Sequence, residues 1–240
     1  MRMKLRVVAK ACCLCIAIFA SLIFINMPAH GITVTVPGTS DPWLAGMPPG
    51  SLSNIGTPEP PDVAPFQSPV FAGSVVSGTL FMWTASGIVG HPGDPAGPDG
   101  APFIFNHSTG AENGISNIMV PIDSLLGVFL GVSQPDLTPA PGALDFSTLA
   151  SRNYLMLFPE LKQVFFMGDG LTDTAVAQTI VAPLGATRLF LGTMDGYGWA
   201  NNIGSFDVTI AAVPEPATML LLGSGLIGLA GYGRKKFFKK

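Results

Sequence analysis

Cysteine is scarce in this chain of 240 residues. The three cysteines, Cys12, Cys13 and Cys15, all lie within the first 31 residues, so the rest of the chain has none. Disulfides therefore cannot stabilise the part after residue 31, which must depend on a hydrophobic core.

Basic residues are also scarce between residues 32 and 213. That region has three of them, Arg152, Lys162 and Arg188, against fourteen acidic residues, which gives a formal charge of −11. Nucleic-acid binding depends on cationic contacts with phosphate, so we exclude a nucleic-acid partner. A surface of this charge suits an extracellular, solvated protein and divalent cations.

Motifs of catalysis are lacking as well. The chain has no G-x-S-x-G and no H-E-x-x-H sequence, and no pair of carboxylates stands out. His91 and His107, the two histidines beyond residue 31, lie in polar segments and are predicted to be solvated loop residues. We therefore expect a protein that is not an enzyme and place a hydrolase third among the possible functions.

Long segments with helical periodicity are absent from residues 70–212, where short β-rich runs recur between turns rich in Gly, Pro, Asp and Asn. This pattern predicts an all-β domain over residues 70–212, an antiparallel β-sandwich or jelly roll. The expected strands are Val70–Val76, Thr79–Ser86, Ile118–Ile122, Gly127–Val132, Tyr154–Phe158, Gln163–Met167, Thr187–Gly192 and Phe206–Ala211.

Proline is abundant just before this domain, with nine prolines between residues 37 and 69. We expect residues 32–69 to be extended or loop-like. The segment either acts as a spacer or wraps the domain, and the apolar run Trp43-Leu44-Ala45-Gly46 suggests that its beginning docks on a surface.

The first 31 residues have the order of a secretory signal peptide. Four basic residues among the first ten precede an apolar run from Ala11 to Ile25 and a small-residue zone around Ala29 and Gly31. We expect this signal helix to be removed after export.

The last 28 residues form a second, three-part signal. Val213-Pro214-Glu215-Pro216 precedes an uncharged stretch at 217–233 and a basic end at 234–240. The stretch predicts a transmembrane helix at the short end of the usual length, and the basic end keeps the C-terminus in the cytoplasm. The tail is either a permanent single-pass anchor or a sorting signal that is processed.

This tail resembles the PEP-CTERM (VPEP) signals of Gram-negative bacteria. The resemblance implies processing by an exosortase-type membrane protease and export across the inner membrane. The protein would then be membrane-anchored, at the cell surface or extracellular. It also implies a structural or adhesive role in an exopolysaccharide or biofilm layer, our first functional hypothesis.

One loop within the domain has the composition of a ligand site. Between two expected strands, Asp195, Asn201 and Asn202 supply carboxylate and amide oxygens, which suit a hard cation. Tyr197 and Trp199 would offer flat faces to a sugar ring. The simpler interpretation is a hairpin whose Asp and Asn residues favour left-handed turn geometry.

The same loop resembles the calcium loop of galactose-binding, calcium-dependent bacterial lectins, which also have an Asp, an Asn-Asn pair and Gly-Ser-Phe before a strand. The resemblance implies calcium ligation by Asp195, Asn201 and Asn202, with the ion contacting sugar hydroxyls. A Thr ligand of those lectins has no counterpart here, since Gly198 lies near its place. Calcium-dependent carbohydrate binding is our second functional hypothesis.

Two further acidic segments are candidates for a cation site. Asp169 and Asp173 flank Gly170-Leu171-Thr172, which is either a plain turn or part of a second cation site. Asp94 and Asp99 lie in another Gly- and Pro-rich loop. We expect these acidic loops to share an ion only if the fold brings them to the same end of the sandwich.

Overall fold

The computed structural model describes residues 31–213 and 223–225. Residues 31–213 belong to one compact unit. Most of the expected signal peptide, Pro214–Pro216, the basic end and the greater part of the 217–233 span lie outside the described residues. Within residues 31–213 and 223–225, no helix is long and apolar enough to cross a membrane.

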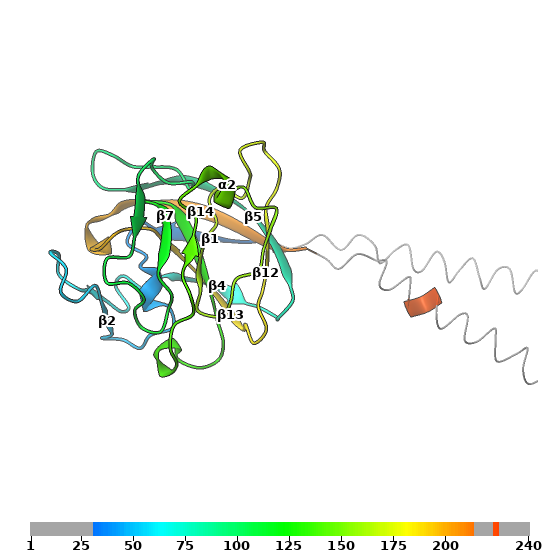
Figure 1. Cartoon of the computed structure of the whole chain (residues 1–240), viewed down its shortest axis with the longest axis horizontal. Helices are drawn as coiled ribbons and strands as arrows, with labels where there is room; N and C mark the ends of the chain where they lie inside the picture. Colours follow the sequence, from blue (N-terminus) through cyan, green and yellow to red (C-terminus); the bar gives the residue numbers. More distant parts are fainter. Residues whose placement is uncertain (1–30, 214–222, 226–240) are drawn as a thin grey trace, which may run out of the picture. The chain divides into compact units, whose positions relative to one another are not determined.

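Two main sheets build the compact unit (Figure 1). The larger sheet contains, in spatial order, β1 (Ile32–Pro37), β14 (Ile203–Ala212), β5 (Leu80–Gly90), β12 (Thr179–Val181) and β10 (Met156–Leu157). The smaller one contains β11 (Val164–Phe166), β8 (Leu125–Leu130), β13 (Arg188–Thr193) and β4 (Val70–Ser74).

Minor elements complete the unit. One short sheet pairs β2 (Leu52–Ser53) with β3 (Asp62–Val63), and another joins β6 (Ile104–Asn106), β7 (Ile118–Pro121) and β9 (Leu144–Asp145). The described helices of this unit are η2 (Pro42–Leu44), η3 (Pro135–Leu137), α2 (Leu149–Arg152) and η4 (Trp199–Asn201).

The core lies between the two main sheets. Along β14 the buried residues Phe206, Val208 and Ile210 alternate with more exposed ones, the period expected of a strand with one face inward. Side chains of the two sheets meet there, and the rings of Phe81 on β5 and Phe129 on β8 lie 6.3 Å apart. This packing makes the unit a β-sandwich.

The mostly-β prediction is confirmed, and each of the eight expected strands overlaps a strand of the structure. The strand pairing is not purely antiparallel, because β10 pairs with β12 and β7 with β9 in parallel. These pairs are two residues long and join loop segments to sheet edges, so no periodicity in the sequence signals them.

The proline-rich segment is integral to the unit rather than a spacer. β1 pairs with β14 along its whole length, from Ile32 opposite Ile210 to Pro37 opposite Ser205. Trp43 is fully buried, and η2 lies against β8 and β13. All six residues of β8 are buried. The residue 69/70 boundary expected from the prolines is therefore not a boundary of the compact unit.

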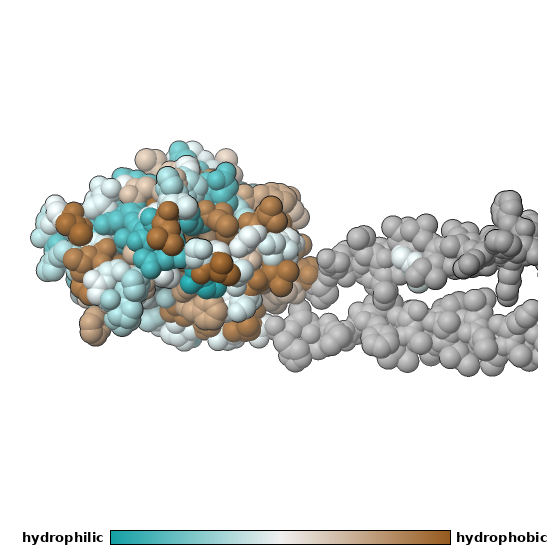
Figure 2. Space-filling view, turned by 90° about the horizontal axis from the view of Figure 1, so that it is seen from below, coloured by the Kyte–Doolittle hydropathy of each residue, from teal (hydrophilic) through white to brown (hydrophobic). Residues whose placement is uncertain are grey.

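The surface of this unit mixes polar and apolar residues. Figure 2 shows one face on which hydrophilic and hydrophobic residues alternate in patches. Scattered exposed apolar residues are normal on a soluble surface and by themselves carry no functional meaning.

Candidate functional site

Two loops meet at one end of the sandwich and bring acidic and amide side chains together. Asp195 and Asn202 lie between β13 and β14, and Asp123 lies between β7 and β8. The loops are joined by backbone hydrogen bonds: Asp123 N–H donates to the carbonyl of Met194 (2.8 Å) and Met194 N–H to that of Ser124 (2.9 Å).

Each of these three side chains is buried and has one oxygen without a hydrogen-bond donor. Asp123 and Asp195 are 3% exposed and Asn202 is 7% exposed. The unpartnered atoms are Oδ1 of Asp123, Oδ2 of Asp195 and Oδ1 of Asn202. A buried acceptor left unsatisfied costs about 1–3 kcal/mol, so three in one place point to a missing positively charged or donor group.

The other unpartnered buried side-chain atoms of the described residues have a different character. They are Nε1 of Trp83, a donor, and Oε1 of Gln178, an acceptor. Gly170 lies close to the Trp83 indole, and its carbonyl accepts from the backbone N–H of Gln178 (2.9 Å). A donor and an acceptor suit a bridging water, whereas three acceptors do not satisfy one another.

The other side-chain polar atoms of Asp195 and Asn202 are held by the backbone. Oδ1 of Asp195 accepts from Tyr197 N–H (3.2 Å), and Nδ2 of Asn202 donates to the carbonyl of Gly38 (3.3 Å). Gly90, with φ of +143°, lies so close that an added Cβ would stand 3.1 Å from the carboxyl of Asp123. The site is thus confined by its neighbours.

The electrostatics of the site disfavour carboxylates without a counter-ion. Burial raises the pKa of Asp123 to about 6, with a further increase from the charge of Asp195 and a decrease from His91. Burial also raises the pKa of Asp195, while the Tyr197 N–H, His91 and the Asn202 amide lower it. Nε2 of His91 lies 3.8 Å from Oδ2 of Asp195.

These oxygens fit a hard cation in ligand type, since calcium takes carboxylate, amide and backbone carbonyl oxygens. Within residues 31–213 and 223–225, no group of three or more His, Cys, Asp or Glu side chains has metal-binding geometry. A cation here would therefore depend on Asn202 and on further carbonyl or water ligands beside the two carboxylates.

The structure brings some of the predicted site residues together and places others elsewhere. Asp195 and Asn202 come together, whereas Asn201 is exposed and its side chain has no hydrogen bond within the described part of the chain. Trp199 is fully buried, and its Nε1 donates to the carbonyl of Thr193 (2.9 Å). It therefore offers no face to a sugar, which corrects that expectation. Tyr197 is 36% exposed and keeps an accessible ring.

Asp123 was missed by sequence reasoning. It follows the β-rich run that ends at Ile122, and its φ of +66° is unusual for a non-glycine residue. Nothing in the sequence separates it from an ordinary turn aspartate, because its role depends on Asp195, 72 positions later, lying beside it.

A buried polar network supports the loop that carries Asn202. The carboxylate of Asp62 accepts from the N–H groups of Trp199 and Ala200 (both 3.2 Å) and from Nδ2 of Asn54 (2.7 Å). Asp41, fully buried, accepts from Trp43 N–H (2.8 Å) and from the Ser53 hydroxyl. Burial raises the pKa of both Asp41 and Asp62. Residues of the proline-rich segment thus hold the site from beneath.

His107 belongs to this network and is fully buried, which corrects the expectation of a solvated histidine. Its ring stacks on Trp43 at 3.7 Å, and Nδ1 and Nε2 lie 2.7 Å from the carbonyl of Gly110 and from Oδ1 of Asn54. Burial lowers the pKa of His107 to about 4, against the opposing effects of Gly110 and Glu112.

A neutral imidazole donates from one nitrogen only, so it cannot satisfy two oxygen acceptors. The neutral ring therefore donates to the carbonyl of Gly110 or to Oδ1 of Asn54, but not to both.

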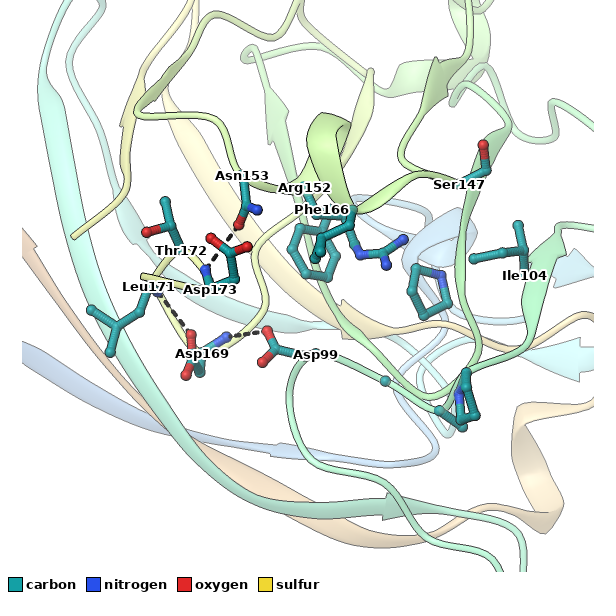
Figure 3. A pocket seen from close by; sticks show the side chains of 15 residues that line it. Asp99, Ile104, Ser147, Arg152, Asn153, Phe166, Asp169, Leu171, Thr172 and Asp173 are labelled. Carbon is teal, nitrogen blue, oxygen red and sulfur yellow. Dashed lines mark hydrogen bonds between the residues drawn. The ribbon is translucent and has the colours of Figure 1, made fainter. Parts of the chain in front are cut away.

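The second acidic region divides between two places. Asp99, Asp169 and Asp173 line one pocket (Figure 3). Asp94 instead lies near Asp123, whose pKa its charge helps to raise. The four carboxylates considered together in the sequence therefore do not form one ion site.

Comparison with known proteins bears on the C-terminal tail alone. No curated protein matches the chain. A family model described as the PEP-CTERM protein-sorting motif matches residues 212–235. The chain therefore carries a PEP-CTERM protein-sorting motif, which indicates an exported protein that exosortase sorts.

Proposed function

We propose that the chain is a structural or adhesive protein of the cell surface or extracellular matrix whose β-sandwich binds calcium. The ligands are Asp195 and Asn202, as expected from the loop, together with Asp123 in place of the exposed Asn201. The single observation that supports this is the set of three buried acceptor oxygens without a donor.

The charge of the region agrees with a cation ligand. A bound divalent ion would offset the repulsion between Asp123 and Asp195, which helps to raise the pKa of Asp123. In an exposed, polysaccharide-rich layer such an ion would also rigidify the loops at this end of the sandwich. A binding role also agrees with the absence of the catalytic motifs sought in the sequence.

The test is a thermal unfolding measurement on the full chain, kept in a non-glycosidic detergent, with calcium and with EDTA. Calcium at 100 times its dissociation constant should stabilise the protein by about 2.7 kcal/mol. Asp195→Ala should abolish this response, while Asp136→Asn, at an exposed carboxylate away from the site, should keep it. An equal melting temperature with calcium and EDTA would contradict the proposal.

Calcium-dependent carbohydrate binding is the second candidate. It is favoured by Tyr197, whose exposed ring lies two residues from Asp195 and whose N–H holds that carboxylate. Galactose added with calcium should raise the melting temperature further, and Tyr197→Ala should remove the increment. A calcium response without a galactose response would restrict the site to a structural role.

A further inference from the structure

A separate cavity of about 460 Å³ opens beside α2. Its walls come from the loop before β6, from α2 and the residues around it, and from the chain that follows β11 (Figure 3). The volume lies within the range of roughly 300–1,000 Å³ typical of small-molecule sites. None of the residues of the Asp195 site lines it.

One wall of this cavity presents acceptors that are already held in place. Oδ1 of Asp99 accepts from Asp169 N–H (3.1 Å), and Oδ1 of Asp169 accepts from Leu171 N–H (2.8 Å). The second oxygen of each carboxylate has no partner within the described residues. The N–H of Asp173 donates to Oδ1 of Asn153 (2.9 Å), and the Asp173 carboxylate has no hydrogen bond within the described residues.

The guanidinium of Arg152 supplies donors to the same cavity. Nη1 donates to the carbonyl of Phe146 (2.7 Å), and the other N–H groups have no partner in the described part of the chain. No carboxylate lies within 4.0 Å of this side chain there. Burial raises the pKa of Asp99, and the charge of Arg152 opposes that increase. In Figure 3 the guanidinium lies beside the Phe166 ring, between the carboxylates and Ser147.

Apolar groups make up the rest of the lining, among them Ile104, Pro121, Leu149 and Phe166. The cavity therefore combines fixed acceptors, free donors and an apolar wall. An anion would be repelled by the three carboxylates. A ligand with cationic donors alone would leave the remaining Arg152 N–H groups without an acceptor, and a purely apolar ligand would leave all these groups unsatisfied. A bare metal ion is disfavoured because the carboxylates lack metal-binding geometry.

We propose that this cavity binds an uncharged saccharide unit without the help of a cation. Sugar hydroxyls both donate and accept, so vicinal hydroxyls satisfy the carboxylates and the guanidinium at once, and the C–H face of the ring packs on the apolar wall. The binding stands apart from the calcium site in both position and ligand chemistry.

The test uses the full chain in a non-glycosidic detergent with EDTA present, titrated with the methyl glycosides of glucose, galactose and mannose. At least one glycoside should bind. Asp169→Asn and Asp173→Asn should each weaken binding roughly tenfold or more, since each removes a charged hydrogen-bond acceptor. Both changes preserve side-chain shape, and Asp136→Asn serves as the matched control.

A second measurement does not depend on any variant. The bound glycoside should protect Arg152 from phenylglyoxal, read by mass spectrometry, but not Arg188, which donates to the carbonyls of Gly131 and Ser133 elsewhere. Absence of glycoside binding in EDTA would overturn the proposal. Binding that neither carboxylate variant weakens and that leaves Arg152 unprotected would overturn it as well. Loss of the calcium response alone would leave it intact.

Discussion

The two acidic regions of this unit have similar compositions but differ in the burial and hydrogen bonding of their carboxylates. At Asp123 and Asp195 the carboxylates are buried, and one oxygen of each has no donor. Around Asp99 and Asp169 the carboxylates are more exposed, accept backbone N–H groups and face a guanidinium. The first arrangement requires a positive charge from outside, whereas the second can hold a neutral ligand.

The first prediction concerns the buried network of Asp41, Asp62 and His107. This network supports the Asp195 region, and the open cavity lacks one. Unfolded histidine takes up a proton near pH 6.5, but folded His107 does so only near pH 4. Below pH 6.5 the unfolded state therefore binds more protons than the folded state. The free energy of unfolding decreases as the pH is lowered from about 6.5 to about 4. The loss should be on the order of 3 kcal/mol.

The measurement is urea unfolding of wild type and of His107→Gln between pH 4 and 7. The buried Asp41 and Asp62, whose raised pKa values act in the opposite direction, contribute to both proteins, so the difference between the two slopes isolates His107. Parallel slopes would show that His107 has the same pKa in the folded and unfolded states, which would contradict the prediction.

The second prediction exchanges one carboxylate in each region for an amide. Asp123→Asn should make the protein more stable in EDTA at pH 7.5 by about 1–3 kcal/mol, because it removes a buried charge that Asp195 repels. The same variant should lose most of the calcium response. Asp99→Asn should keep the calcium response, because the Asp99 carboxyl lies in the other region.

Thermal unfolding of the three proteins with calcium and EDTA checks this. An Asp123→Asn protein that is less stable in EDTA would mean that Asp123 has a purely structural role. The two regions would then not differ in their need for a positive charge from outside.

The third prediction uses one glycine from each region. An alanine at Gly90 would place its Cβ 3.1 Å from the Asp123 carboxyl, and one at Gly168 would collide with Oδ1 of Asp99. Both positions have positive φ, so each variant should lose about 1–2 kcal/mol of stability. Gly90→Ala should weaken only the calcium response and Gly168→Ala only glycoside binding.

Calorimetric titration of both variants with calcium and with the methyl glycosides distinguishes the effects. If either glycine variant weakened both ligands equally, the two regions would be coupled rather than independent.

Much of the fold could be predicted from the sequence because strand signals are local. The eight strands expected from alternation and turn residues all overlap strands of the structure. β1 was overlooked because the prolines after it dominated the interpretation, although Pro37 merely ends an edge strand, where a missing N–H is tolerated. The three-residue β12 was missed because a run so short has no measurable period.

The candidate site was only partly predictable. The loop chemistry indicated Asp195 and Asn202, yet it also indicated Trp199, which the core buries, and Asn201, which points to solvent. Asp123 and the network of Asp62 and His107 depend on contacts between distant segments. No pattern within a short window could have joined them.

The sequence by itself determined the class of structure, the acidic charge, the cysteine-free domain and the sorting tail, because composition, alternation and a three-part signal are local properties. The tertiary structure decided which carboxylates meet. A hydrogen bond or a repulsion depends on distance in space, and only the packed sandwich places Asp123 beside Asp195 and Asp169 beside Asp99.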